Sequence, residues 1–567
     1  MHVVATAGHV DHGKSALIKA LTGMEPDRWA AERSRGMSID LGFCWTSRAG
    51  ESIAFVDVPG HERFLSNALA GVGCCQAVIL VVAADEGWMP QTFEHLDALN
   101  ALGIRCGVVA VSRSDLADPG PVLAETRERL AGTSLEGIPA VAVSAVSGLG
   151  IEDLLAALTP QLVAAPLGAA PARMWIDRSF SVRGSGTVVT GALCSGQISN
   201  GDSLFVPRLG RPLEIRGLHC LGEPVGKAAA FSRVAINLRR VPAEALHRGD
   251  ALVTPEHWLA VSSVDVRVHE SVQLPREILV HVGTAKVTGV QRRLGDDTIR
   301  LRLATPLPLH VGDRLALRAA GSRSIVGATV LDPEPAPLAG RGAAARRGKE
   351  LADVAGSAGD GAAALRLRKV ASTGMLTAIG VTPPGDPVLG DWHVDPAHAI
   401  ALRDNIHRQV TAADMAHRAV SMEVIQHRLG LPDAALVAAL LPDSVQLDRG
   451  EVRPVTRQPL PAATLRALNL LPSHVVDTSE LSRVGLRKPE VNTVVEHGRL
   501  VRVGGGFMLS GAMTQAVEVL AALDQPFTVS QARQALGVSR RHTLMLLEHL
   551  DATGVTQCQP DRTRRMS

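Results

Sequence analysis

The amino-acid sequence predicts a multidomain protein in which an α/β domain is followed by two β-barrel domains and then by tandem winged-helix domains. Up to about residue 163, short apolar runs alternate with longer amphipathic stretches, a pattern typical of parallel strands and crossover helices. From 173 to about 331, short Val, Ile and Leu runs are broken by Gly and Pro. From 341 onward, a helical periodicity rich in Ala, Leu and Arg takes over. The length of 567 residues agrees with several domains, because one domain usually has roughly 100–200 residues.

The first domain is expected to span residues 1–165. Its continuous apolar runs predict buried parallel strands, and the amphipathic stretches between them predict helices on both faces of the sheet. The strands are expected at 3–7, 53–58, 77–83, 107–111 and 140–143, with helices that include 14–21 and 91–102.

The β-rich middle of the chain lies between two linkers that are rich in proline and alanine, at 164–171 and 332–340. We expect two β-barrel domains here, 172–258 and 259–335.

Four winged-helix domains are expected after the second linker, at 341–394, 395–455, 456–510 and 511–567. The last is the clearest. A helix is predicted at 528–536, a turn at Gly537, and a second helix at 539–551 that Ser539 caps. A wing strand is predicted at 554–559.

Composition narrows the class of protein. The hydrophobic fraction of 46% and the charged fraction of 20% are those of folded globular proteins. The longest apolar run, 77–84, is far shorter than the ~20 residues of a membrane span, and no signal peptide is recognised. None of the seven cysteines falls in a C-x-x-C pair, so neither a zinc site nor a disulfide is expected. We predict a reduced, cytoplasmic location without a membrane partner.

A phosphate-binding loop is the strongest motif. Its residues are Gly8, His9, Val10, Asp11, His12, Gly13, Lys14 and Ser15, which match G-x-x-x-x-G-K-[ST] between a predicted strand and a predicted helix. The glycines allow backbone N–H groups to wrap phosphates, and the helix N-terminus attracts anions. Lys14 is expected to reach the β- and γ-phosphates, and the Ser15 hydroxyl to bind Mg²⁺.

Two further segments complete the expected phosphate site. Asp57 ends a predicted strand and can hold Mg²⁺, the N–H of Gly60 can sense a γ-phosphate, and His61 is the candidate catalytic residue that orients the attacking water. Ser38, in the loop 35–40, can complete the Mg²⁺ shell only when the γ-phosphate is present, which predicts a switch. The expected metal ligands are therefore Ser15, Ser38 and Asp57. No arginine finger is evident, so slow hydrolysis stimulated by a partner is expected.

The predicted base site favours GTP over ATP. A guanine reader usually has Asn-Lys-x-Asp after the fourth strand, and here Ser112, Arg113 and Asp115 stand in that pattern. The Asp115 carboxylate can accept from guanine N1–H and from the exocyclic amine, a donor pair that adenine lacks. Ser144 and Ala145 follow the next strand and are expected to contact guanine O6 through the backbone. The expected ligands are GTP or GDP with Mg²⁺.

The motifs at 8–14 and 57–61 resemble those of translational GTPases such as elongation factor Tu. The segments 35–42, 64–71 and 175–191 are similar, more narrowly, to the family of selenocysteine-specific elongation factors, SelB. The resemblance is specific over 1 to about 255, architectural to about 335, faint in the middle modules, and returns in the last one. Two departures are Ser38, where the family has Thr, and Ser112-Arg113, where it has Thr or Asn followed by Lys.

The resemblance implies an aminoacyl pocket at Asp177, Arg178 and Arg233 for selenocysteinyl-tRNA. A selenol is anionic near neutral pH, so two guanidiniums favour a selenolate over neutral serine, and Asp177 can receive the α-amino group.

The resemblance also implies that the last domain binds the mRNA hairpin that marks a recoded UGA codon. The candidate RNA-binding residues are Arg540, Arg541, Arg562, Arg564 and Arg565. Shape and phosphate contacts are expected to dominate, because aromatic residues for base stacking are scarce. The implied partners are selenocysteinyl-tRNA, the selenocysteine-insertion hairpin and the ribosome, which would stimulate hydrolysis by a monomeric protein.

Three other functions remain open at this point. A general aminoacyl-tRNA carrier or an initiation-type GTPase shares the first three domains but needs neither the long tail nor the Asp-Arg pair at 177–178. A GTPase subunit of a sulfate-activating enzyme would end near 340–450. A DNA-binding regulator would need no phosphate-binding loop.

Overall fold

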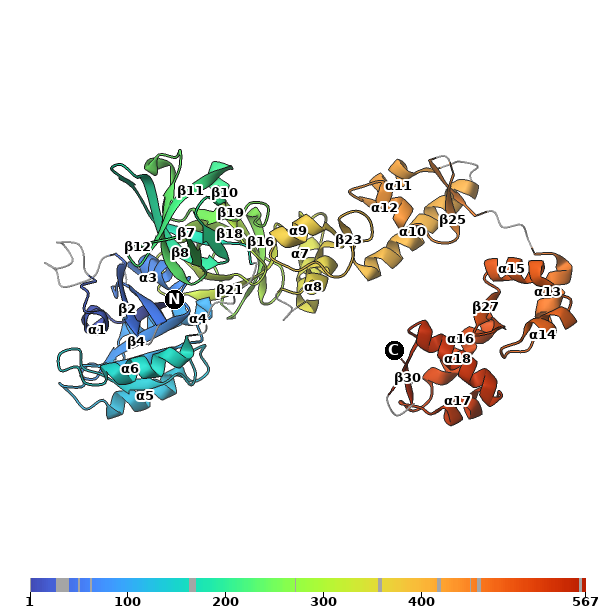
Figure 1. Ribbon diagram of the computed structural model, residues 1–567, viewed down its shortest axis with the longest axis horizontal. Helices are drawn as coiled ribbons and strands as arrows, with labels where there is room; N and C mark the ends of the chain where they lie inside the picture. The colour runs from blue at the N-terminus through green and yellow to red at the C-terminus, as the bar shows by residue number, and fades with distance from the viewer. Residues whose placement is uncertain are drawn as a thin grey trace. The chain divides into compact units, whose positions relative to one another are not determined.

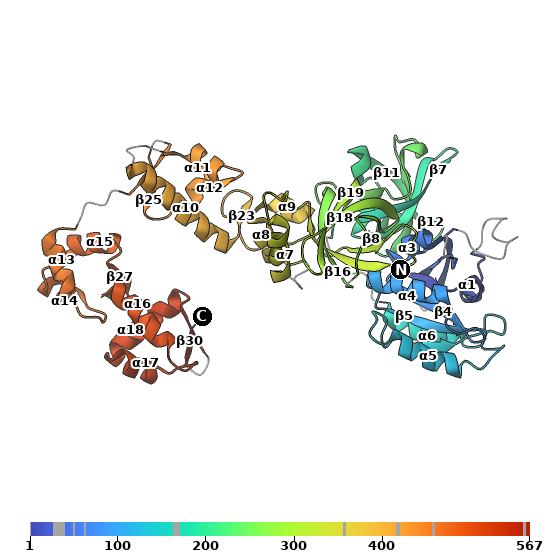
Figure 2. The same cartoon turned by 180° about the vertical axis from the view of Figure 1, so that it is seen from behind.

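The structure is a computed structural model, and it describes residues 2–26, 40–48, 51–61, 64–162, 170–270, 272–354, 359–415, 420–448, 450–455, 460–559 and 563–566. The chain forms two compact units, which are described separately. One contains Met1–Arg408 and Ser421–Leu441, and the other contains Gln409–Val420 and Pro442–Ser567. In Figures 1 and 2 the α/β domain is blue, the barrels are green and the last helical modules are orange to red.

The first domain is a six-stranded sheet in the order β2-β3-β1-β4-β5-β6. All neighbouring strands are parallel except β2, which is antiparallel to β3. The predicted strands are confirmed, and β2 is an additional edge strand that was not predicted. The elements are β1 (His2–Gly8), α1 (Lys14–Thr22), β2 (Gly42–Arg48), β3 (Glu51–Asp57), α3 (Leu65–Val72), β4 (Ala77–Ala83), α4 (Pro90–Leu102), β5 (Gly107–Ser112), α5 (Gly120–Leu130), β6 (Ala140–Ala142) and α6 (Ile151–Leu158).

Helices cover both faces of this sheet. Leu17 and Leu154, from α1 and α6, belong to the hydrophobic core on one face. Leu69 and Leu99, from α3 and α4, belong to the core on the other face. The central strands β1 and β4 are buried along their whole length. The loop after β1 begins at the carboxyl end of this buried pair. This is the edge of a doubly wound sheet where ligands usually bind.

The first barrel follows from alternating side chains, as in β14, where every second residue is buried. Six strands, β10-β15-β7-β8-β14-β11, form a ring that the β10–β11 pairing closes, and β12 extends it. The strands are β7 (Arg173–Val182), β8 (Gly186–Ser195), β9 (Gln197–Ser199), β10 (Ser203–Val206), β11 (Arg211–Cys220), β12 (Glu223–Val225), β13 (Lys227–Ala229), β14 (Ser232–Leu238) and β15 (Ala251–Val253), with β9 paired to β13.

The second barrel is closed in the order β16-β19-β18-β17-β20-β21. Its strands are β16 (Ala260–Val268), β17 (Glu277–Val282), β18 (Ala285–Arg293), β19 (Thr298–Pro308), β20 (Arg314–Arg318) and β21 (Val326–Pro333). The multidomain fold class predicted from the sequence is therefore confirmed for the α/β domain and both barrels.

Helices with short strand pairs make up the rest of the chain, as predicted. The elements up to residue 454 are α7 (Ala343–Asp353), α8 (Gly361–Arg368), β22 (Val370–Ser372), α9 (Thr373–Ala378), β23 (Trp392–Val394), α10 (Pro396–Met415), β24 (Val420–Ser421), α11 (Met422–Leu429), α12 (Ala435–Ala439), β25 (Val445–Asp448) and β26 (Glu451–Pro454). Those after it are α13 (Ala462–Asn469), α14 (Thr478–Arg483), α15 (Lys488–Glu496), β27 (Leu500–Val503), β28 (Gly506–Leu509), α16 (Ser510–Ala521), α17 (Val529–Leu536), α18 (Arg540–Ala552), β29 (Thr556–Cys558) and β30 (Arg564–Met566).

The last module has the winged-helix features that its sequence predicted. Thr528 caps α17 in a reciprocal capping box with Gln531, and Gly537 ends that helix at a φ of 65°. The Ser539 hydroxyl accepts from the His542 N–H at 3.3 Å and caps α18. The antiparallel strands β29 and β30 then form the wing.

The cysteine prediction was wrong in one respect, because Cys74 and Cys194 form a disulfide across 120 residues of sequence. The spacing of the two cysteines gives no signal, since only the packing of the α/β domain against the first barrel brings them together.

Among the residues that the structure describes, no helix is both long and apolar enough to cross a membrane.

Candidate functional site

The phosphate-binding loop lies where β1 ends and α1 begins, and its glycines are required by the backbone. Gly8 has a φ of 131°, and a Cβ there would lie 2.2 Å from the carbonyl oxygen of Val81 on β4. Gly13, with a φ of 83°, immediately precedes the helix. Only glycine adopts these conformations at little energetic expense. The loop therefore keeps its backbone N–H groups at the N-terminus of α1, where an anion is favoured.

Lys14, Ser15 and Asp57 come together beside this loop. The Lys14 ammonium donates to the carbonyl oxygens of Gly8 at 3.0 Å and His9 at 2.6 Å. Burial lowers the pKa of Lys14 to about 8, against the opposing charges of Asp57 and Asp11. A polyphosphate would add negative charge next to this buried ammonium and favour its protonated form.

Asp57 and Ser15 fit a Mg²⁺ ion. The Ser15 hydroxyl donates to one carboxylate oxygen of Asp57 at 2.6 Å, and the Thr6 hydroxyl donates to the other at 2.7 Å. A hydroxyl and a carboxylate in contact are the oxygen ligands that Mg²⁺ prefers beside a phosphate. Ser38, the third predicted ligand, lies outside the described residues.

The segment after Asp57 rests on the phosphate-binding loop. A Cβ on Gly60 would lie 2.5 Å from Lys14 Nζ and 2.7 Å from the Val10 nitrogen, so only glycine allows this approach. His61 follows, with its ring centroid 6.1 Å from that of Phe64. The predicted catalytic histidine therefore directly follows the glycine that approaches the phosphate-binding loop.

Two residues of the site were missed by sequence reasoning. Gln91 and His95 lie one turn apart on α4, and both accept from the loop backbone. The Val10 N–H donates to Gln91 Oε1 at 2.9 Å, and the Gly8 N–H donates to His95 Nδ1 at 2.9 Å. Burial, with the positive charge of Lys14, lowers the pKa of His95 to about 3, so its ring is a neutral acceptor. Polar residues at i and i+4 on a buried helix face are a signal that could have identified this pair.

Ser112 and Arg113, two residues of the predicted base site, bind the backbone of the phosphate-binding loop. The Ser112 hydroxyl donates to the His12 carbonyl oxygen at 2.7 Å. Arg113 donates to the Asp11 carbonyl oxygen, and it also binds Asp85 at 3.0 Å and Glu86 at 2.7 Å. The side chains that depart from the family pattern therefore contact the backbone of the phosphate-binding loop.

The remaining residues of the predicted base site lie on two neighbouring loops. Asp115 is exposed, two residues beyond Arg113. Ser144 is fully buried, and its hydroxyl accepts from the Ser147 N–H at 3.1 Å. Ala145 is half-buried and is followed by Val146, whose side chain is 90% exposed. An exposed apolar side chain here offers a surface on which a flat base can lie.

A second site lies where the first barrel faces β2 and β3. A β-bulge in β7 places Ile176 opposite Gly191 and Arg178 opposite Thr190, so Asp177 is the extra residue. Bulges re-aim side chains. Asp177 accepts from the Thr190 hydroxyl at 2.6 Å and pairs with both nitrogens of the Arg233 guanidinium. Burial opposes ionisation, but the charge and hydrogen bonds of Arg233 keep the pKa of Asp177 below its usual range.

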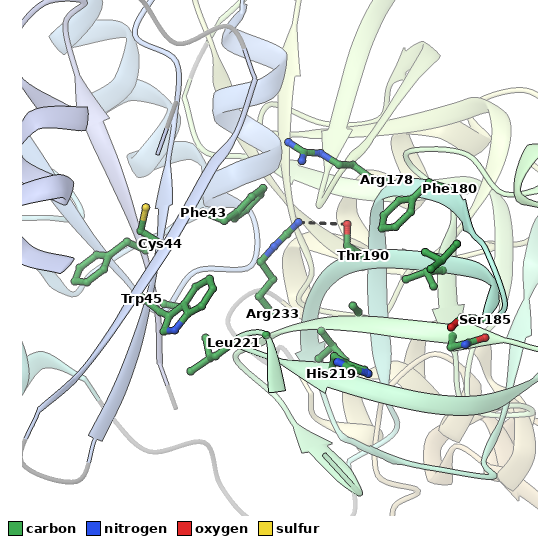
Figure 3. A pocket seen from close by; sticks show the side chains of 18 residues that line it. Phe43, Cys44, Trp45, Arg178, Phe180, Ser185, Thr190, His219, Leu221 and Arg233 are labelled. Carbon is green, nitrogen blue, oxygen red and sulfur yellow. Dashed lines mark hydrogen bonds between the residues drawn. The ribbon is translucent and has the colours of Figure 1, made fainter. Parts of the chain in front are cut away.

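Arg178, Thr190 and Arg233 line a cavity of 460 Å³, shown in Figure 3. Phe43 and Trp45 of β2 form the opposite wall, and the Arg233 guanidinium carbon lies 3.3 Å from the centroid of the Phe43 ring. This volume is in the range of roughly 300–1,000 Å³ typical of small-molecule sites. The three residues predicted for the aminoacyl pocket therefore lie together, although Asp177 is buried against Arg233 and does not line the cavity.

Arg178 is also tied to the α/β domain. It donates to Asp40 at 2.9 Å and to the Leu41 carbonyl oxygen at 3.1 Å. Arg248 reaches the same Asp40 carboxylate at 3.6 Å. Asp40 lies two residues before β2, at the end of the segment that contains Ser38. One acidic residue thus links the predicted switch to the predicted aminoacyl pocket.

The C-terminal arginines separate into two groups. Arg540 and Arg541 are exposed on the first turn of α18, and Arg565 is exposed on β30. Arg564 is instead buried, and its Nε donates to Asp551 at 2.8 Å. Arg562 lies outside the described residues. Exposed arginines at a helix N-terminus, such as Arg540 and Arg541, are suited to contact phosphates. Arg564 instead joins the wing to α18.

Two family models match the chain. One is described as the elongation factor Tu GTP binding domain and matches residues 1–163, and the other is described as the winged helix of elongation factor SelB and matches residues 518–565. The matched ranges contain the phosphate-binding loop and the last winged helix.

Relatives extend this comparison. The selenocysteine-specific elongation factor of Escherichia coli (strain K12) is 37% identical over 342 residues, which cover 59% of this chain and 56% of that protein. The translation initiation factor 2 subunit gamma of Thermococcus kodakarensis is 31% identical over 391 residues, which cover 56% of this chain and 94% of that protein. A crystal structure of a bacterial selenocysteine-specific elongation factor, EF-Sec, covers all of this chain with a TM-score of 0.71 and 27% identity. The chain spans about half the length of the selenocysteine-specific relative that it matches.

The fold and the phosphate site, with the family-model match, define a GTP-binding protein, and its class implies GTP hydrolysis. The chain belongs to the family of translational GTPases built on the elongation factor Tu GTP-binding domain. Within that family, the resemblance to selenocysteine-specific elongation factors that its motifs indicated is confirmed.

Proposed function

We propose that this protein carries selenocysteinyl-tRNA to the ribosome at UGA codons marked by an mRNA hairpin. The observation that carries this proposal is the cavity between the first barrel and β2, which Arg178 and Arg233 line and behind which Asp177 pairs with Arg233. An amino acid attached to tRNA presents a side chain, and this cavity offers it two guanidiniums. For Asp177 to receive the α-amino group, its carboxylate would have to exchange part of its contact with Arg233.

The charges of this cluster suit selenocysteine better than serine. A selenolate is anionic near neutral pH, and a charge-assisted hydrogen bond from a guanidinium is roughly twice as strong as a neutral one. Serine presents a neutral hydroxyl of similar size. Because Arg178 and Arg233 lie in a partly buried wall with the Phe43 ring, water screens their charge less than at an open surface.

GTP binding and hydrolysis follow the phosphoryl-transfer pattern, in which positioning and electrostatics lower the barrier. Mg²⁺, when bound by Ser15, Asp57 and Ser38, would neutralise phosphate charge. Lys14 would hold the phosphates at the loop, the Gly60 N–H would contact the terminal phosphate, and His61 would orient the attacking water. We infer that the ribosome stimulates this step.

The last winged helix is the proposed hairpin-binding domain. Arg540 and Arg541 on α18 and Arg565 on the wing are exposed basic side chains of this domain. The SelB winged-helix match over residues 518–565 supports this assignment. An initiation-type function is favoured by the gamma-subunit relative, whose match covers 56% of this chain, whereas the bacterial EF-Sec structure covers all of it.

The test is the binding of selenocysteinyl-tRNA and seryl-tRNA on the same tRNA body, with a non-hydrolysable GTP analogue present. We expect a strong preference for the selenocysteinyl form that Arg233→Ala and Arg178→Ala reduce by at least about tenfold. Arg239→Ala is the matched control, because Arg239 is an exposed arginine of the same barrel that pairs with Glu214. Equal binding of the two aminoacyl forms would favour a general carrier and would refute the proposal.

A further inference from the structure

A disulfide joins the GTP-binding domain to the first barrel. Cys74 follows α3, Cys194 lies on β8, and their Cα atoms are 5.2 Å apart. Figures 1 and 2 both show α3 beside β8. We propose that Cys74 and Cys194 form a redox-controlled covalent link between these two domains. Because disulfides are rare in reducing compartments, and those that occur are usually transient or redox-sensing, a link between two domains points to regulation.

The two cysteines of the pair differ in burial. Cys74 is 7% exposed and packs in the core of the second barrel with Trp175 and Val282. Cys194 is only half-buried. Since exchange begins by attack on an accessible sulfur, a small thiol or oxidant would act first at Cys194. Cys74 would then be released inside the packed interface, beside its former partner.

The neighbouring Cys75 does not compete for this bond. Its thiol is buried and donates to the Gly71 carbonyl oxygen at 2.9 Å. Burial also raises the pKa of Cys75 far above its usual range, which suppresses the reactive thiolate. The structure therefore selects Cys74, and not the adjacent cysteine, as the partner of Cys194.

The chemistry is reversible and balanced. Hydrogen peroxide converts the Cys194 thiolate to a sulfenic acid with loss of one water equivalent, and the Cys74 thiol then displaces a second water to form the S–S bond. Two thiols and one peroxide thus give one disulfide and two water molecules. A small dithiol reverses the reaction through a mixed disulfide and is itself oxidised.

The link connects elements that adjoin both proposed sites. α3 begins a few residues after Asp57 and Gly60, which belong to the phosphate site. β8 carries Thr190, whose hydroxyl donates to Asp177 in the proposed aminoacyl pocket. A bond across this interface resists any relative movement of the two domains when the nucleotide changes. This consequence rests on the proposed function, whereas the existence of the link does not.

Mass spectrometry tests the link directly. The full chain is treated with peroxide or with dithiothreitol, free thiols are blocked by alkylation, and the protein is digested without reduction. We expect a cross-linked peptide that joins Cys74 to Cys194 after peroxide, and its loss after dithiothreitol or in Cys194→Ser. Cys75→Ser and Cys558→Ser, the latter at an exposed free cysteine, should keep it. Full alkylation of Cys74 and Cys194 after peroxide, or a link through Cys75, would overturn the proposal.

A binding measurement tests the consequence. The ratio of selenocysteinyl-tRNA affinities with a GTP analogue and with GDP is measured for the reduced and the linked protein. We expect linking to shrink this ratio by about fivefold or more, and Cys194→Ser to be insensitive to peroxide. An unchanged ratio in protein shown to be linked would overturn the regulatory role. Reduced protein without a preference for selenocysteinyl-tRNA would instead refute the proposed function and leave the mass result intact.

Discussion

Asp40 binds Arg178 across the boundary between the GTP-binding domain and the first barrel, with 2.9 Å between the Asp40 carboxylate and the guanidinium. The two residues are 138 positions apart in the sequence. Asp40 lies just after the segment that contains Ser38, and Arg178 lines the proposed aminoacyl cavity. Any movement of the Asp40 segment with the nucleotide would therefore change the charge that Arg178 can offer to a ligand.

Asp40→Asn is expected to raise the affinity for selenocysteinyl-tRNA in the presence of GDP. The uncharged amide cannot form an ion pair with Arg178, so the positive charge of this guanidinium becomes available to an anionic ligand. Partly exposed ion pairs contribute up to ~1 kcal/mol each, which predicts a gain of about fivefold. Fluorescence titration with labelled tRNA measures it.

Arg178→Ala in the Asp40→Asn background is the control. If Asp40 acts by competing for Arg178, the gain should largely disappear in the double variant. A gain that persists without Arg178, or a GDP-state affinity that Asp40→Asn does not change, would contradict this relationship.

The sheet of the first domain could be predicted because its central strands are uninterrupted apolar runs, as in the fully buried β4. β2 was missed, since GFCWTSR mixes apolar and polar residues without a strand period. The helices of the last module could be located from Thr528, Gly537 and Ser539, because capping chemistry is local in sequence.

Contacts between distant segments could not be predicted in the same way. His95 lies 87 residues from Gly8 in the sequence and accepts a hydrogen bond from its N–H, and Cys74 lies 120 residues from Cys194. The local sequence does not say which distant residue either side chain meets, because the packing of whole elements decides this. The phosphate-binding loop was found from its motif, while the residues that hold its backbone needed the fold.

Arg113→Ala is expected to weaken GTP and GDP binding by about tenfold. The variant removes the guanidinium that joins the Asp11 carbonyl oxygen to Asp85 and Glu86, and charge-assisted hydrogen bonds contribute roughly 1.5–3 kcal/mol. Stopped-flow fluorescence with a labelled nucleotide gives both rate constants. Arg127→Ala, at an exposed position on α5, should leave them unchanged. Equal rates for Arg113→Ala and the unaltered protein would show that Arg113 does not support the loop.

Acid is expected to destabilise the GTP-binding domain through His95. The folded pKa of His95 is about 3, below the ordinary value of 6.5, so the unfolded chain binds more protons between these values. The contribution is fully present above pH 6.5 and is lost as the pH falls toward 3. Between pH 7.5 and 5.5 this loss is about 1 kcal/mol for one such histidine.

His95→Gln tests this dependence, because a glutamine amide can accept from the Gly8 N–H without titrating. Urea unfolding at pH 7.5 and 5.5 should show a smaller loss of unfolding free energy in the variant than in the original chain. His257→Gln, a half-buried histidine for comparison, should retain the full loss. The same pH dependence in the original chain and in His95→Gln would rule out His95 as the source.

Arg564→Ala is expected to lower stability and Arg540→Ala to lower RNA affinity, although both change an arginine of the last module. Arg564 is buried against Asp551, so its loss leaves a partly buried carboxylate and should lower the unfolding free energy by roughly 1–3 kcal/mol. Arg540 is exposed at the start of α18, so its loss should leave stability unchanged. The loss of Arg540 should instead lower the affinity for the RNA hairpin and reduce the salt dependence of binding by about one counterion.

Thermal unfolding and hairpin titration at several salt concentrations, both on the full chain, separate the two effects. An Arg540→Ala variant with unchanged hairpin affinity and unchanged salt dependence would remove the N-terminus of α18 from the proposed RNA interface.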